Sequence, residues 1–227
     1  MRAGPVGVDA VPMCGDAVPT RMNADQRHTL FLRWLAPDGA GLDAIDALRV
    51  EHHVMTAVLA AMEAEAERML GGASLRPDFW RNVIDCNGNF VHRCHRTKEE
   101  SLLVPALVAN GILAERQVQA VHREHVAGGE LTQSLCEGIG EADWEKVLRL
   151  VAIYAHLMRP HMQREEEGLF ALAATLPMPV RERLRADCVA VEQQVLGADG
   201  RARFAAMARG LAEQAGVAHA LTLTPGA

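Results

Sequence analysis

The stretch HRCHRTKEE, His92 to Glu100, places two histidines, a cysteine and two glutamates within nine residues of a 227-residue chain. Such a cluster is either a solvated helix face or a set of side chains directed at a metal ion. Residues three or four apart share one face of a helix, so His95 and Glu99 lie together, whereas His92, Arg96 and Glu100 lie mostly off that face. The apolar residues on either side are in phase with His95 and Glu99, which are therefore expected to face a core.

Outward from this stretch, the pattern predicts an all-α chain. Alanine, leucine, glutamate and arginine recur every three to four residues, and glycine and proline gather at a few breaks. The predicted helices span residues 25–35, 43–70 (with Asp43 as N-cap), 78–109, 113–136, 143–175, 180–196 and 201–214, and Pro105 and Pro160 should kink two of them.

Four long helices joined by short turns favour an up-down-up-down four-helix bundle. The predicted organisation is a flexible lead (1–22), a short helix and linker (23–41), the bundle (42–176), and C-terminal helices with a tail (177–227).

Each long helix carries one histidine in phase with its apolar stripe, which includes Leu102 on the second helix and Ile153 on the fourth. Two of these histidines are followed by a glutamate four residues later. A single core histidine is usually structural, but two carboxylates facing a bundle core are costly unless a cation compensates them. Residues equally far from a hairpin turn lie at the same height in antiparallel helices. The midpoints of residues 52 and 95, and of 95 and 125, fall in predicted turns, whereas the midpoint of 125 and 161 is offset from its predicted turn by about one helical turn. The predicted ligands of two divalent metals are His52, His95, Glu99, His125, His161 and Glu165.

The remaining polar residues near this layer are expected to be solvated, and Cys94 is expected to pack in the core rather than to be redox-active. The expected solvated residues are Glu51, His92, Arg96, Lys98, Glu100 and Glu124.

Composition excludes several classes of function. The net charge is -6 and the isoelectric point is near 5.9, with no basic cluster, so neither nucleic acid nor a membrane surface is an expected partner. Five widely spaced cysteines without a CxxC motif predict neither a disulfide framework nor a thiolate zinc site, and fit a reducing cytoplasm. No segment has the roughly 20 continuous apolar residues of a membrane span.

Four stretches in order resemble the hemerythrin-like (HHE cation-binding) family of di-iron four-helix bundles. They are LRVEHHVM at His52, FVHRCHRTKEESLLVPAL at His95 and Glu99, VHREHVAGGE at His125, and YAHLMRPHMQREEEGLF at His161 and Glu165. The resemblance covers about residues 42–175 and implies two non-haem iron ions, each held by two of the histidines and bridged by both glutamates.

Two departures favour the bacterial subgroup with four histidine and two glutamate ligands. Oxygen-carrying hemerythrins have a fifth histidine four residues before the third-helix ligand, where this chain has Val121. Whether His122, next to Val121, or His53, next to His52, contributes to the metal site is left open. The second bridge also follows an HxxxE spacing, where the carriers use a longer spacing and an aspartate. The resemblance therefore argues against reversible oxygen carriage, and the same ligands also accept manganese or zinc.

The leading interpretation is a cytoplasmic di-iron protein that binds and reduces or activates O2, H2O2 or NO at an open iron position. The electron donor is unknown, and a homo-oligomer is left open. Tyr154 is the candidate catalytic residue, as a hydrogen-bond donor to bound oxygen, with a simple core tyrosine as the alternative. Two other functions stay open: an O2 or iron sensor read by a partner, and an oxidase of a small organic substrate, for which Gly128, Gly129 and Gly168 leave room.

Overall fold

The computed structural model describes residues 23–36, 39, 41–112 and 115–218. The predicted lead (1–22) and the last nine residues of the predicted tail lie outside this part. The helices are α1 Ala24–Leu35, α2 Ala44–Leu70, α3 Pro77–Asp85, α4 Arg96–Lys98, α5 Val104–Ala109, α6 Glu115–Gly140, α7 Trp144–Arg164, α8 Phe170–Ala173, α9 Met178–Leu196 and α10 Gly200–Gln214. Three π-helical segments join some of them end to end: η2 Cys86–His95, η3 Glu99–Leu103 and η4 Glu165–Leu169.

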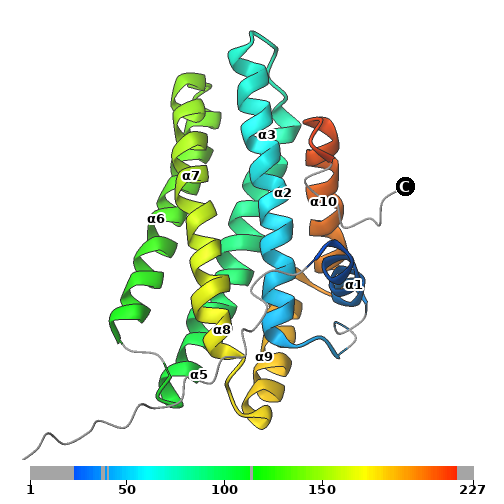
Figure 1. The fold of residues 1–227 in the computed structure, drawn as a ribbon. Helices are drawn as coiled ribbons and strands as arrows, with labels where there is room; N and C mark the ends of the chain where they lie inside the picture. The colour runs from blue at the N-terminus through cyan, green and yellow to red at the C-terminus, as the bar shows by residue number, and fades with distance from the viewer. Residues whose placement is uncertain (1–22, 37–38, 40, 113–114, 219–227) are drawn as a thin grey trace, which may run out of the picture.

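The four long helices form the predicted up-down-up-down bundle (Figure 1). The second of them is continuous from α3 to α5, and the fourth from α7 to α8. Neighbouring contacts join α2 to η2, η2 to α6, α6 to α7, and α7 back to α2, so the four helices enclose one core. Among the described residues, no helix is long and apolar enough to cross a membrane.

Capping residues explain where the bundle helices begin. The Asp43 carboxylate accepts a hydrogen bond from the Ile45 N–H at 2.9 Å, as predicted for the start of α2. Asp143 does the same for α7, by accepting from the Lys146 N–H at 3.0 Å. Gly111, with φ of 68°, ends the second long helix in a left-handed conformation that favours glycine.

The predicted end of the third long helix at residue 136 was wrong. Helix α6 continues through Gly138, which packs against Val147 and Lys146, and ends at Gly140. The turn to α7 is therefore centred near Ala142, which has φ of 55°. This centre is close to the midpoint of His125 and His161, so the offset in register expected from the sequence disappears.

The π-helical segments change which side chains face the core. The N–H of Val104 bonds the Glu99 carbonyl, five residues back, and the N–H of Phe170 bonds the Glu165 carbonyl in the same way. A π-helical turn contains one residue more than an α-helical turn, so it rotates the side chains that follow it about the helix axis. Consequently Leu103, rather than the expected Leu102, is fully buried.

Two other expectations concern these helices. Ile153 was expected to face the core but is 52% exposed, because the buried stripe of α7 runs through Val151 and Tyr154. Pro105 and Pro160 lie inside helical segments as expected, and the kinks stay a prediction.

Two apolar clusters fill the bundle, one on each side of the polar layer. The larger contains Met55, Val91, Met158 and about two dozen other buried side chains, and the smaller contains Leu48, Leu103 and Phe170. Burial of each large apolar side chain contributes about 1.5–3 kcal/mol. These clusters hold the four helices in register on both sides of the predicted ligands.

The C-terminal helices cover one side of the bundle. Helix α9 contacts α2 and η2, and α10 contacts α2 and α3. Helix α1 packs on α2 and α10, on the side of α2 away from α6 and α7 (Figure 1). The two halves of the bundle therefore have different surroundings.

Candidate metal centre

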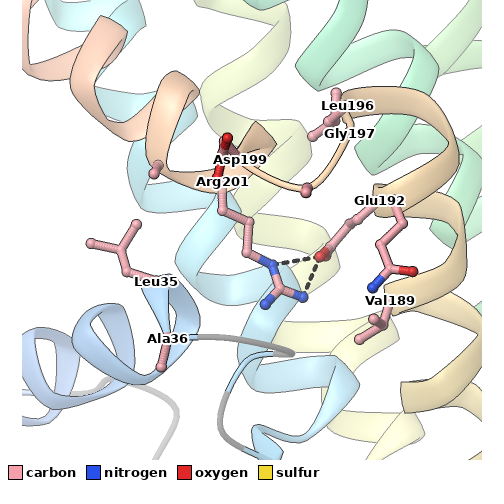
Figure 2. Close-up of a pocket in the computed structure, with 11 residues that line it drawn as sticks. Leu35, Ala36, Val189, Glu192, Leu196, Gly197, Asp199 and Arg201 are labelled. Atoms are coloured by element: carbon pink, nitrogen blue, oxygen red, sulfur yellow. Dashed lines mark hydrogen bonds and ion pairs between the residues drawn. The ribbon is translucent and has the colours of Figure 1, made fainter.

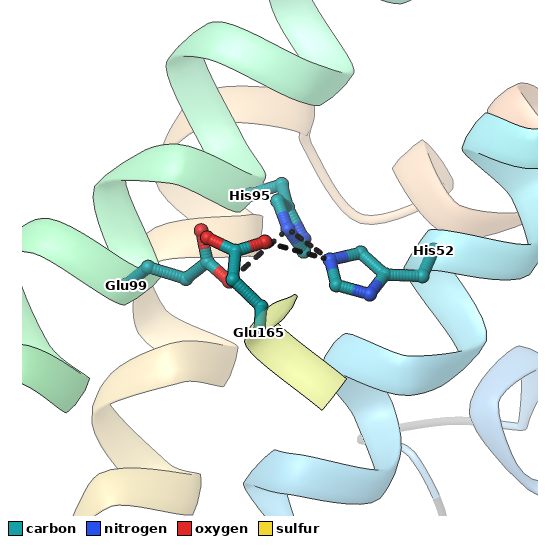
Figure 3. Close-up of side chains that lie close together, drawn as sticks. All are labelled: His52, His95, Glu99 and Glu165. Atoms are coloured by element: carbon teal, nitrogen blue, oxygen red, sulfur yellow. Dashed lines mark hydrogen bonds and ion pairs between the residues drawn. The ribbon is translucent and has the colours of Figure 1, made fainter. Parts of the chain in front are cut away.

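All six predicted ligand side chains come together in the layer between the two apolar clusters. Each is at most 6% exposed. Figure 3 shows His52 of α2, His95 of η2, Glu99 of η3 and Glu165 of η4 directed toward a common point. His125 of α6 and His161 of α7 complete the layer.

The six side chains form two groups suited to a metal ion. One group is His52, His95, Glu99 and Glu165, and the other is His125, His161 and Glu165; in each, the ligand atoms lie within 4.8 Å of one another. In both halves the two imidazole rings have a centroid separation of 4.8 Å. Glu165 belongs to both groups, as a bridging carboxylate would.

Glu99 also lies between the two halves. Its Oε1 is 3.4 Å from Nε2 of His95, and its Oε2 is 3.2 Å from Nε2 of His125. For Glu165, Oε2 lies 3.2 Å from Nε2 of His161 and 3.4 Å from Nε2 of His52. Each carboxylate thus reaches imidazoles from both helical hairpins.

Several atoms that face the centre lack hydrogen-bond partners among the described residues. Both carboxylate oxygens of Glu99 and of Glu165, and Nε2 of His125, are buried without one. The carboxylate oxygens lie within ion-pair distance of the imidazole nitrogens, but the geometry between them is not that of a hydrogen bond. These atoms therefore point at a shared centre rather than at one another. Buried carboxylates left this way are costly, and a cation bound between them would satisfy them.

Each of the four histidines is held from behind by a second carboxylate. The Nδ1 contacts are His52 to Glu166 (3.1 Å), His95 to Glu51 (2.8 Å), His125 to Glu100 (3.0 Å) and His161 to Glu124 (2.9 Å). An ionised carboxylate only accepts, so Nδ1 carries the proton and Nε2 presents its lone pair to the centre. The Nε2 atoms of His52 and His95 lie 3.1 Å apart, and two lone pairs this close require a proton or a cation between them.

The imidazoles and carboxylates of the layer shift one another's pKa values. Burial lowers the pKa of His52, but the nearby carboxylates of Glu165 and Glu166 outweigh it and raise that pKa to about 10. Burial also lowers the pKa of His125, but Glu165 and Glu99 outweigh it and raise that pKa to about 10. The pKa of Glu99 is held well below its ordinary value by His95 and His125, against the effect of burial. Without a metal, protons on the imidazoles balance the carboxylates.

The expectation that Glu51 is solvated was wrong, because it is fully buried. Glu100 and Glu124 are partly exposed, but like Glu51 each reaches across to a histidine on another helix. A repeat in the sequence carries this signal. Residues 51–52 and 124–125 both read EH, and HRTKEE at 95–100 matches HMQREE at 161–166. The glutamate of each EH supports the histidine of its partner helix, and the last glutamate of each six-residue stretch supports the histidine of the other EH.

His92 and Arg96, also expected on a solvated face, are partly buried. The Nε2 of His92 lies 2.8 Å from the Thr132 hydroxyl, and burial lowers the pKa of His92 to about 4, so the ring is neutral. Arg96 donates to the His125 carbonyl at 3.2 Å. The helix α6 covers this face, which the periodicity of one helix cannot show.

Lys98 is the clearest correction, because its side chain is only 1% exposed. Its ammonium group contacts Glu51 and lies 2.9 Å from Oε1 of Glu192 on α9. Glu192 in turn accepts from Nε of Arg201 on α10 at 2.5 Å, and this pair borders a cavity of about 230 Å³ between α1, α9 and α10 (Figure 2). Burial raises the pKa of Glu51, but Lys98 and His95 lower it to about 2.

The corresponding position in the other half, Arg164, is 54% exposed and pairs with Glu124 at 2.5 Å. The repeat therefore has the same charges in both halves but different burial. The difference arises because α9 lies over η2. The Glu51 and Lys98 pair behind His95 is enclosed by the C-terminal helices, while the Glu124 and Arg164 pair behind His161 is accessible to solvent.

Tyr154, the predicted catalytic residue, is not brought into this group. It is buried beside Met55 and Met158, and burial raises its pKa despite a hydrogen bond with Thr132. A role as donor to a bound ligand stays a prediction.

Three other residues singled out in the sequence lie outside the two metal-binding groups. The exposed His122 has its Nδ1 3.1 Å from Glu100, and the Nδ1 of His53 lies 2.7 Å from the Arg49 carbonyl. Cys94 is fully buried, which raises its pKa to about 12 and keeps it a thiol. Burial of this kind suits packing.

Comparison with protein families matched residues 43–173, more than half of the chain, to the family described as the hemerythrin HHE cation-binding domain. The matched region contains all six predicted ligands and their four supporting carboxylates. Comparison with curated proteins and with solved structures gave no match.

Proposed function

The chain belongs to the hemerythrin family of HHE cation-binding domains, and on this premise we propose that it is a cytoplasmic non-haem di-iron protein. In this proposal it binds and reduces or activates O2, H2O2 or NO. The observation that supports it best is the convergence of four imidazoles and two carboxylates. Among the described residues, both carboxylates and Nε2 of His125 have no hydrogen-bond partner. Imidazole with carboxylate, and without thiolate, suits non-haem iron.

The residues themselves have separable roles. His52 and His95 would hold one iron, His125 and His161 the other, with Glu99 and Glu165 between them. Bound iron supplies a Lewis acid and electrons for small oxidants. The four supporting carboxylates fix the Nδ1 protons and so keep each Nε2 directed inward.

An open side supports access of a small ligand. Val121 stands where oxygen carriers have a fifth histidine, and it lines a cavity of about 310 Å³ that reaches Glu165. The second half, with His125 and His161, is therefore the proposed reactive side.

A sensor is the second candidate. The contact between Lys98 and Glu192 joins the layer to α9, so a change at His95 can reach the C-terminal helices. This candidate predicts a ligand complex without turnover.

Metal content and its response to oxidant test the proposal. The purified protein should hold close to two iron ions, and His95→Ala or Glu165→Ala should lose most of them. His53→Ala is the matched control, because His53 bonds a backbone carbonyl outside the layer. Full metal retention in both ligand variants contradicts the site. Peroxide consumption by the reduced protein supports turnover, and a lasting spectral change without consumption supports sensing.

A further inference from the structure

The cavity beside the candidate metal centre lies between α6 and the η4–α8 end of the fourth helix. Its wall is apolar where Val121, Leu169 and Leu172 line it. Its polar end is formed by Glu165 and by the paired side chains of Glu124 and Arg164. One end thus meets Glu165, which belongs to both ligand groups of the candidate metal centre, and the rest offers an apolar surface.

The volume of about 310 Å³ is far more than O2, NO or H2O2 requires. A cavity of roughly 150 Å³ is enough to hold benzene. Gly168 enlarges the space, because a Cβ added there would meet no atom within 4 Å. The cavity therefore has room for an organic molecule with about six carbons.

The charges specify the head of such a molecule. The side chain of Arg164 is 54% exposed and lines the polar end of the cavity together with Glu165. Cations held by Glu165 would add positive charge there, whereas without them Glu124 and Glu165 would repel an anion. An anionic oxygen group fits this end only when the centre is loaded.

We propose that this cavity binds a small organic acid or a similar molecule with an anionic oxygen head and an apolar body. The head lies toward Arg164 and Glu165, and the body packs on Val121, Leu169 and Leu172. Recognition of the anionic head rests on the proposed function, because it requires a metal-loaded centre. Recognition of the apolar body rests on the cavity alone. It names an organic ligand class for the reactive side of the centre.

Calorimetry of the zinc-loaded protein with acetate and hexanoate tests it, because zinc brings no redox reaction. Four additional methylene groups should make hexanoate at least tenfold tighter than acetate, since each buried methylene is worth about a factor of four. Val121→Trp, which fills the cavity, should weaken hexanoate at least tenfold. Ile153→Trp on α7, where the side chain is 52% exposed and outside the cavity, is the matched control and should bind as the parent does.

The metal-free protein separates this proposal from the proposed function. Neutral 1-hexanol should bind it, and Val121→Trp should abolish that binding, whether or not the protein holds metal. If Val121→Trp does not fold, Gly168→Leu fills the same space from the other wall. Equal affinities for acetate and hexanoate, unchanged binding in a folded cavity variant, or no binding of either six-carbon probe would overturn the proposal.

Discussion

At the scale of single residues, His52 and His125 link metal binding to protons. Their pKa values of about 10 mean that both imidazoles are protonated at neutral pH in the metal-free protein. A metal needs the neutral ring, so filling both sites should release at least two protons, and the affinity of each site should rise about tenfold per pH unit. Calorimetry of zinc binding in two buffers of different ionisation enthalpy counts these protons. Release of less than one proton contradicts the assignment of both residues as ligands.

The same protons should stabilise the metal-free fold. Both pKa values lie above the ordinary 6.5, so this contribution is complete below about pH 6.5 and is lost as pH rises through about 10. We expect the melting temperature of chelator-treated protein to fall between about pH 7 and pH 10, as followed by circular dichroism. The metal-loaded protein is the control and should show a flatter profile there, because its imidazoles are already neutral. Parallel profiles would argue against this linkage.

At the scale of the elements, α9 turns one of two equivalent charge pairs into a buried one. Lys98→Met removes the buried ammonium group that pairs with Glu51 and Glu192, and should cost about 3–5 kcal/mol. The same change at the exposed Arg164 should cost about 0–1 kcal/mol. Urea unfolding of the two variants measures the difference. Equal losses would mean that α9 does not enclose Lys98.

The π-helical turn after Glu99 makes a second prediction. Leu103→Ala removes a fully buried side chain and should cost about 2–5 kcal/mol. Leu102→Ala, at a partly buried position, should cost clearly less. An uninterrupted α-helix would place both residues on the face of Glu99, three and four positions after it, and give similar losses. Denaturant unfolding of this matched pair therefore distinguishes the two backbones.

These elements also show where sequence periodicity succeeds and fails. The positions of His52, His95, His125 and His161 could be predicted because each shares the phase of its own helix. Leu103 could not, because nothing in the local pattern marks the extra residue of η3. The burial of residue 98 could not either, since it depends on which face α9 covers.

At the scale of the whole molecule, the order of the helices and the ligand layer follow from hairpin register, whereas the difference between the two halves does not. The EH and HxxxEE repeat is nearly symmetric in sequence, so sequence alone predicts two equivalent halves. The C-terminal helices remove that equivalence by packing on α2, α3 and η2. The cavity at Val121 lies on the other side, between α6 and the fourth helix.

The polar layer divides the core, so metal should stabilise the entire bundle. Two apolar clusters meet across six buried polar side chains, and cations bound in the two ligand groups would together join all four helices. Zinc at about 100 times its dissociation constant should add about 2.7 kcal/mol for each site to the free energy of unfolding. Thermal melts with and without chelator measure this gain, with His53→Ala as a control that should keep it. His161→Ala should lose the part due to the second site, because it removes one imidazole from the group of His125, His161 and Glu165. A gain of the same size in that variant would mean that zinc stabilises the bundle from somewhere else.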